Sequence, residues 1–305
     1  MTAPLDVVRL REEFQPPHEL VETSDGRMLF LRRWVGSGGT DPVLLLLHGI
    51  TAYSEPYGKL MAEELARAGY HVFGLDLRGH GRSDGVRGDL PSGDRLAKDL
   101  GETLDYLRSS FPRIVVLGHS LGVITTMIAF NHYPRSIDGL VLLSGGRRVR
   151  PGVYRKPAAG QAVKRLLGIA LFRSRPLIEY RREGMLGLDD PLFNFRYSAR
   201  FYAAVYGLSP WAVVRMLRQN IIDSPNLTTS ATIEIPVLVG VGDQDELFTV
   251  ESSRALFDSL RANRKEFFVV PGGHHASFPP GSWGPVVDWL KRQFPVTIAQ
   301  TSTTP

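Results

Sequence analysis

The chain of 305 residues contains no cysteine. That absence excludes disulfide bonds, a thiolate nucleophile and cysteine ligands to a metal. Long hydrophobic runs are also missing, because no stretch approaches the roughly 20 apolar residues that a helix needs to span a bilayer. The start of the chain lacks the apolar core of a signal peptide and carries Asp6, Arg9, Arg11, Glu12 and Glu13 instead. We therefore expect a cytoplasmic protein.

Acidic residues are scarce in one long segment. Residues 147–225 hold 15 Lys and Arg against 5 Asp and Glu, so a net charge of +10 is local and the rest of the chain sums to −5. Within it, residues 163–175 mix apolar and basic side chains, as a helix at an anionic membrane surface would. A solvated helix packed on the core has the same pattern. Nucleic-acid binding is disfavoured, because no nucleic-acid module accompanies the charge.

Patterns of apolar residues predict an α/β fold. Eight strands are expected at residues 18–23, 28–34, 43–47, 71–75, 114–117, 139–143, 236–241 and 266–270. Helices are expected at residues 57–68, 94–110, 121–132, 250–261 and 285–293. From the third strand onward the two kinds of element alternate, which is typical of a parallel sheet with helices on both faces. The alternation breaks once, at an insertion between residues 144 and 225.

Residues 114–122 have the sequence Ile-Val-Val-Leu-Gly-His-Ser-Leu-Gly. Four apolar residues in a row suit a strand at the centre of a parallel sheet. Gly118 and Gly122 flank Ser120 at the two positions where a side chain would clash in a tight strand-to-helix turn. This G-x-S-x-G pattern predicts a nucleophile elbow, although a structural glycine-rich turn would have the same short pattern. A reactive serine also requires a histidine base, an orienting acid and N–H donors for an oxyanion.

Two later strands end in the residue types that such a serine needs. The strand at 236–241 is followed by Gly-Asp-Gln-Asp-Glu, and the strand at 266–270 is followed by Pro-Gly-Gly-His-His. Loops at the carboxyl ends of parallel strands meet at the edge of the sheet where ligands bind. The order serine, acid, histidine is that of an α/β-hydrolase. The candidates, some of which can instead cap turns, are Asp243, Asp245, His274 and His275.

On these residues the chain resembles an α/β-hydrolase, and more narrowly the monoacylglycerol lipase, lysophospholipase and serine aminopeptidase-like branch. Besides the elbow, the matching features are His48-Gly49, the sequence Asp-Leu-Arg-Gly-His-Gly-Arg-Ser-Asp-Gly at 76–85, and Asp190-Pro191-Leu192. The resemblance covers residues 18 to 294. It implies a mostly parallel eight-stranded sheet in a discontinuous core of residues 1–144 and 226–305. A helical cap at 145–225 would be inserted after the sixth strand.

The resemblance also implies roles at the site. Ser120 would be the nucleophile, Asp245 the acid and His275 the base, with Asp243 and His274 less favoured. The oxyanion hole would be the N–H groups of Ile50 and Leu121, and Leu121 would begin a helix, so that its N–H has no intrahelical partner. No cofactor and no metal are expected, and structural hydrogen bonds are expected from His48, His80 and His119.

The predicted function is hydrolysis of a carboxylic ester through an acyl-enzyme, in the manner of a monoacylglycerol lipase or lysophospholipase. The alternatives on the same residues are a short-chain esterase, a thioesterase and a proline-iminopeptidase-like aminopeptidase, and a non-catalytic ligand-binding protein of this fold is a further one. The insertion is rich in aromatic residues that would line an acyl pocket or form the cap's own core: Phe193, Phe195, Tyr197, Phe201, Tyr202, Tyr206 and Trp211. The oligomeric state stays open.

Overall fold

An eight-stranded sheet forms the centre of the computed structural model, which describes residues 5–39, 41–150, 171–180, 187–209, 219, 221–222, 224–229 and 231–295. The strand order is β1-β2-β4-β3-β5-β6-β9-β10. The strands are β1 His18–Glu22, β2 Met28–Trp34, β3 Val43–Leu47, β4 His71–Leu75, β5 Ile114–His119, β6 Gly139–Leu143, β9 Val237–Gly242 and β10 Lys265–Val270. β2 runs antiparallel to β1 and β4, and all other pairs are parallel. The mostly parallel sheet is confirmed, and each predicted strand boundary lies within two residues of the observed one.

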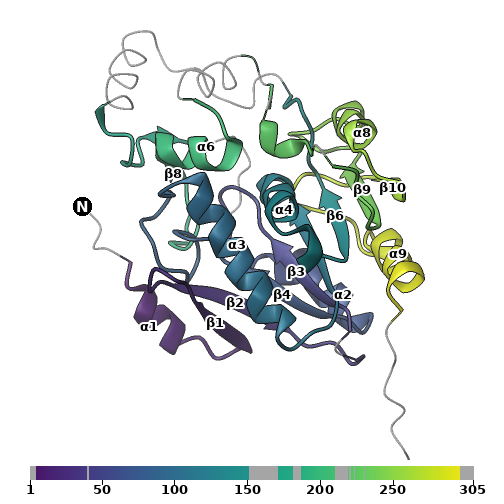
Figure 1. Cartoon of the computed structure of the whole chain (residues 1–305), viewed down its shortest axis with the longest axis horizontal. Coiled ribbons are helices and arrows are strands. Elements are labelled where there is room, and N and C mark those ends of the chain that lie inside the picture. Colours follow the sequence, from purple (N-terminus) through teal and green to yellow (C-terminus); the bar gives the residue numbers. More distant parts are fainter. Residues whose placement is uncertain are drawn as a thin grey trace, which may run out of the picture.

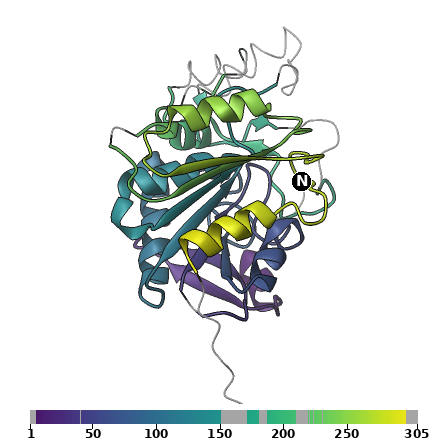
Figure 2. The same cartoon turned by 90° about the vertical axis from the view of Figure 1, so that its right-hand side faces the viewer.

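Helices cover both faces of this sheet (Figures 1 and 2). They are α1 Val7–Glu12, α2 Glu63–Arg67, α3 Gly93–Arg108, α4 Leu121–His132, α8 Val250–Ser259 and α9 Gly284–Gln293. A π-helical turn, Gly58–Ala62, leads directly into α2. Figure 2 shows α9 on one side of the sheet and α8 on the other. The sequence patterns predicted all of these helices except α1.

The unbroken apolar run of β3 follows from this layering. All five of its residues are buried. Val43, Leu45 and Leu47 pack into the core cluster that includes residues of α3, α4 and α8. Leu44 and Leu46 point to the opposite face and pack with residues of α2 and α9. A strand covered on both faces needs apolar side chains at every position, which is why such strands do not alternate with polar residues.

The described part of the predicted insertion packs against the core helices. It contains the short antiparallel strands β7 Ile178–Glu179 and β8 Arg196–Tyr197 and the helix α6 Ala199–Tyr206, and a 3₁₀ turn, Pro225–Leu227, begins at its last residue. In Figure 1, α6 lies above α3 and α4, and it contacts both helices. Trp211 and residues 163–170 of the expected amphipathic helix lie outside the described residues. The division into a core and a cap at 145–225 therefore stays a prediction.

Within the ranges given above, no helix is long and apolar enough to cross a membrane.

Candidate active site

Ser120 lies in a sharp turn between the central strand β5 and helix α4. Its backbone has φ 58° and ψ −115°, which is an uncommon conformation for a residue with a side chain. The two neighbouring glycines permit the turn. A Cβ on Gly118 would lie 2.2 Å from the carbonyl oxygen of Gly122, and a Cβ on Gly122 would lie 2.0 Å from that of Leu47. The clash expected at both positions is thus present.

Three residues distant in sequence form a hydrogen-bonded row at this turn. Nε2 of His275 lies 3.0 Å from Oγ of Ser120. On the other side of the ring, Nδ1 of His275 lies 3.0 and 3.1 Å from the two carboxylate oxygens of Asp245. Because an ionised carboxylate can only accept, Nδ1 carries the proton and Nε2 is free to accept from the serine hydroxyl. The loops after β9 and β10 supply Asp245 and His275, at the same edge of the sheet as Ser120.

Asp245 is fully buried and its charge is well supported. Burial alone would raise the pKa of this carboxyl group, but the attraction of His275 and the N–H groups of Phe248 and Leu247 outweigh it, so that its pKa lies below the usual value. Those two N–H groups donate to the same carboxylate oxygen, at 2.9 and 2.8 Å. The carboxylate is therefore ionised near neutral pH and holds the imidazole of His275 in one orientation.

The two less favoured candidates bond elsewhere. The carboxylate of Asp243 accepts from the N–H of Gly272 at 2.8 Å, so that this aspartate closes a turn between the two loops. His274 is about half exposed, and its Nδ1 lies 2.8 Å from the carboxylate of Glu246. In the described part of the chain, neither residue has a hydrogen bond to Ser120.

Two backbone N–H groups beside Ser120 are candidate donors to an oxyanion. Leu121 is the first residue of α4, so that its N–H lies at the positive end of the helix dipole. Ile50 follows His48-Gly49 at the end of β3, and both residues line the hollow around Ser120. Within the described residues neither N–H donates a hydrogen bond. They are the donors to which the family resemblance assigned the oxyanion.

The three buried histidines near the site make the structural hydrogen bonds that were expected. Nδ1 of His48 lies 2.8 Å from the carbonyl oxygen of Gly49, and its Nε2 accepts from the N–H of Leu77. His80 is bonded to the carbonyl oxygen of Arg78. Burial lowers the pKa of His48 to about 4 and that of His119 to about 3. These rings are therefore neutral near pH 7. No group of three or more His, Asp or Glu in the described residues has the spacing of a metal site.

Two residues of the site were not singled out in the sequence. Glu246 accepts from the N–H of His275 at 2.9 Å, and the hydroxyl of Tyr57 accepts from the N–H of Gly49 at 2.8 Å. The position of Glu246, next to Asp245, is a signal that sequence reasoning can use. Tyr57 has no such signal, because only the fold brings it beside the elbow.

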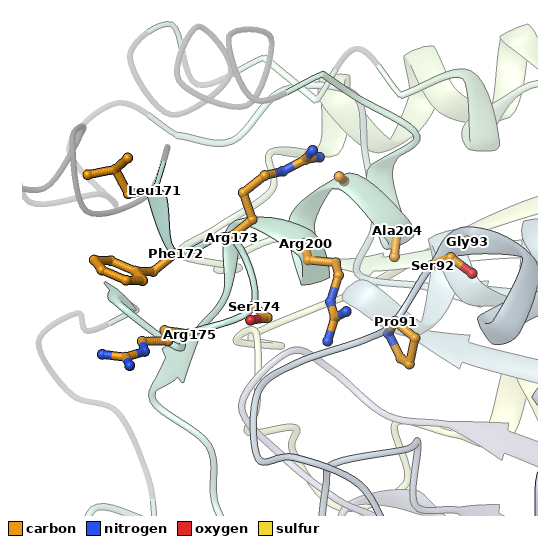
Figure 3. A pocket seen from close by; sticks show the side chains of 11 residues that line it. Pro91, Ser92, Gly93, Leu171, Phe172, Arg173, Ser174, Arg175, Arg200 and Ala204 are labelled. Carbon is orange, nitrogen blue, oxygen red and sulfur yellow. The ribbon is translucent and has the colours of Figure 1, made fainter.

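A cavity of about 370 Å³ opens beside Ser120 and His275. Its apolar lining includes Ile50, Leu60, Phe193 and Phe278, and a second hollow, of about 30 Å³, is also lined by Ser120. A larger hollow, of about 640 Å³, lies between α6 and the start of α3 and contains no residue of the hydrogen-bonded row (Figure 3). The volume of a hollow alone therefore does not identify the active site.

The expected cap aromatics divide between the cavity and the core. Phe193 lines the cavity beside Ser120, and Phe195 stacks on it. The rings of Tyr197, Phe201 and Tyr202 are fully buried in the larger core cluster, as in the alternative interpretation.

The chain is similar to proteins of a known family. The sequence model of the family described as serine aminopeptidase, S33, matches residues 38–278. The monoacylglycerol lipase of Mycolicibacterium smegmatis is 27% identical over 253 residues, which are 78% of this chain and 83% of that protein. The uncharacterized Escherichia coli protein YnbC is 27% identical over 271 residues, and this chain spans only 43% of its length while 85% of this chain is covered.

A solved structure has the same fold. The monoacylglycerol lipase of Paleococcus ferrophilus superposes with a TM-score of 0.63 at 24% identity, and the match covers 87% of this chain and 99% of that one. The chain belongs to the serine aminopeptidase S33 family of α/β-hydrolases and falls in its monoacylglycerol lipase-like branch.

Proposed function

We propose that this protein is a serine hydrolase that cleaves a carboxylic ester through an acyl-enzyme on Ser120. One observation carries the proposal: Nε2 of His275 lies 3.0 Å from Oγ of Ser120 while Nδ1 is held by the buried Asp245. A nucleophile, a base within hydrogen-bond reach and an orienting acid are the parts that covalent catalysis by serine requires.

The reaction would proceed in two steps. His275 takes the proton of Ser120 as Oγ attacks the ester carbonyl, and Asp245 stabilises the imidazolium that forms. The tetrahedral intermediate then collapses, His275 gives its proton to the leaving alcohol, and the acyl group remains on Ser120. In the second step the same histidine activates a water molecule, which releases the carboxylic acid.

The N–H groups of Ile50 and Leu121 would bind the oxyanion of each tetrahedral intermediate. Each is a backbone group whose position is set by the elbow and by the end of β3, so that it needs little reorganisation when charge develops. Loss of one such donor costs about 3 kcal/mol of barrier in enzymes where a side-chain donor has been removed.

The lining of the cavity favours an acyl ester over an amino-terminal peptide. A free α-amine needs an acidic partner, and none of the described residues that line the cavity is an aspartate or a glutamate, whereas the basic Lys59 is among them. Apolar Ile50 and Phe193 suit a hydrocarbon chain, and about 370 Å³ lies at the small end of ligand cavities. The name of the mycobacterial relative, monoacylglycerol lipase, supports the same substrate class.

A peripheral contact with an anionic membrane belongs to the same proposal. Leu171 and Phe172 are 73% and 46% exposed, and Arg173 and Arg175 are their neighbours. Figure 3 shows Leu171, Phe172 and Arg175 directed away from the start of α3. Exposed apolar and basic side chains together suit a lipid surface. If activity on micellar esters is insensitive to salt and to anionic lipid, the electrostatic part of this proposal is wrong.

The substrate proposal is tested with p-nitrophenyl esters from acetate to palmitate, with 1-monoacylglycerol and lysophosphatidylcholine alongside, using wild type and Ser120→Ala. Activity that peaks at medium or long chains and is lost in Ser120→Ala supports a lipid esterase. Activity on acetate and butyrate alone points to a small-ester hydrolase. Failure on every ester, together with no labelling of Ser120 by a phosphonate probe, would overturn the proposal in favour of a non-catalytic protein.

A further inference from the structure

A second row, of three buried hydrogen bonds through Tyr57 and His119, connects the loop of Ile50 to the loop of His275. The N–H of Gly49 lies 2.8 Å from the hydroxyl oxygen of Tyr57. That oxygen lies 2.8 Å from Nδ1 of His119, and Nε2 of His119 lies 2.8 Å from the carbonyl oxygen of His275. Tyr57 and His119 are 3% and 2% exposed, so water does not compete for these bonds.

The direction of every bond in the row follows from its two ends. The N–H of Gly49 can only donate, so the oxygen of Tyr57 accepts there and its own proton is free to point at His119. The carbonyl oxygen of His275 can only accept, so Nε2 of His119 must carry the proton and Nδ1 must accept. Burial, with a smaller effect from the neighbouring His275, lowers the pKa of His119 to about 3 and keeps the ring neutral, as this arrangement requires.

His275 is consequently held on both sides of its main chain. Its carbonyl oxygen accepts from His119, and its N–H donates to the carboxylate of Glu246 at 2.9 Å. Its side chain is bonded to Asp245 and Ser120. The backbone from which the imidazole projects is therefore fixed by the side chains of His119 and Glu246.

We propose that Tyr57 and His119 are positioning residues that hold the oxyanion loop and the loop of His275 at one fixed separation across the elbow. The Ile50 N–H follows Gly49 directly, and His119 directly precedes Ser120. The row thus ties the oxyanion donor, the nucleophile and the base into one unit, and an acyl carbonyl meets all three at once. This inference rests on the proposed function, because it concerns the geometry of the same reaction.

The sharpest variant is Tyr57→Phe, which keeps the ring and removes only the hydroxyl. It leaves the N–H of Gly49 without an acceptor and His119 without its donor. We expect kcat for a p-nitrophenyl ester to fall about 10- to 100-fold, because small misplacements of reacting groups have effects of this size. KM is expected to change less than threefold, because the apolar lining of the cavity is retained.

Tyr70→Phe is the matched control. Tyr70 is as buried as Tyr57, and its hydroxyl donates to a main-chain carbonyl, that of Phe294 at 3.2 Å, away from the site. It is expected to lower the midpoint of urea unfolding about as much as Tyr57→Phe and to leave kcat unchanged. If both variants retain wild-type kcat, or if both lose it equally, the positioning role is wrong.

A second variant tests whether the two residues act through the same bond. His119→Gln keeps an amide that can donate to the carbonyl of His275 but has no acceptor where Nδ1 was. Tyr57→Phe and His119→Gln should lower kcat by similar factors, and the double variant should be no worse than either. Factors that multiply in the double variant would show two independent effects and would overturn the proposal.

The tautomer of His119 separates this inference from the proposed function. In ¹⁵N NMR of the wild type we expect a neutral ring protonated at Nε2 across pH 5 to 8, and a loss of that single form in Tyr57→Phe. A wild type that cleaves esters while Tyr57→Phe keeps its kcat refutes the inference alone. A wild type that cleaves no ester refutes the proposed function, and a ring protonated at Nδ1 then refutes the inference as well.

Discussion

Gly122→Ala is expected to damage both stability and catalysis, and the structure gives the reason. The new Cβ would lie 2.0 Å from the carbonyl oxygen of Leu47, whereas such atoms essentially never approach within 3.0 Å. The obstructing atom belongs to the backbone of β3 and cannot turn away as a flexible side chain would. Helix α4 and the end of β3 must therefore separate by about 1 Å.

The expected magnitudes follow from that displacement. Overpacking of a buried site costs about 1 to 3 kcal/mol of unfolding free energy. The same shift separates the two oxyanion donors, because Leu121 begins α4 and Ile50 lies three residues after Leu47. A misplacement of about 1 Å lowers catalytic rates about 100-fold. We therefore expect Gly122→Ala to lose about 2 kcal/mol and to lower kcat about 100-fold on the best ester.

The assay pairs urea unfolding, followed by tryptophan fluorescence, with ester hydrolysis. Gly284→Ala is the matched control. Gly284 is the first residue of α9, as Gly122 is the second of α4, but no atom lies within 4 Å of its added Cβ. That control is expected to change stability by less than about 1 kcal/mol and to keep wild-type kcat. If Gly122→Ala matches Gly284→Ala in both measurements, the explanation of the elbow is refuted.

Three further outcomes are expected. Asp245→Asn should lower kcat about 10⁴-fold, because the amide favours the wrong imidazole tautomer, and steady-state kinetics that show less than a tenfold loss would contradict this role. The folded pKa values of His48 and His119, about 4 and about 3, lie below the ordinary 6.5, so that between these values and 6.5 each ring binds fewer protons in the folded than in the unfolded chain. The free energy of unfolding is thus full above pH 6.5 and decreases as the pH falls, by up to about 1.4 kcal/mol per pH unit for each ring. Equal urea midpoints at pH 7 and pH 5 would refute this expectation. Asp99→Asn removes the buried partner that Arg78 contacts at 2.7 Å and should cost about 3 kcal/mol, whereas Asp25→Asn, at the exposed partner, should cost less in the same urea titration.

Local sequence patterns predicted the parts of the fold that local physics determines. The apolar run of β3 identified a strand buried on both faces, and the clash at Gly118 and Gly122 identified the sharp turn at Ser120. Strand ends shifted by one or two residues, because pairing with a neighbouring strand decides where a ladder stops. Helix α1 was missed because its few apolar residues show little of the spacing that a buried helical stripe requires.

Contacts between distant residues were beyond sequence reasoning. Residue spacing left Asp243 and Asp245 equally open, and the family resemblance was needed to favour one. The bond of Tyr57 to His119 joins residues 62 positions apart, and that of His119 to His275 spans 156 positions. No periodicity in the sequence reports on such a pair, because the sheet order brings the residues together.

The measurement that tests the central claim most directly is mass spectrometry of the Ser120 peptide after a p-nitrophenyl ester reaction is quenched in acid within milliseconds. The account predicts a burst of p-nitrophenol, an added acyl mass on Ser120, and neither burst nor adduct in Ser120→Ala. Turnover by the wild type with no acyl group on Ser120, or turnover retained by Ser120→Ala, would contradict it.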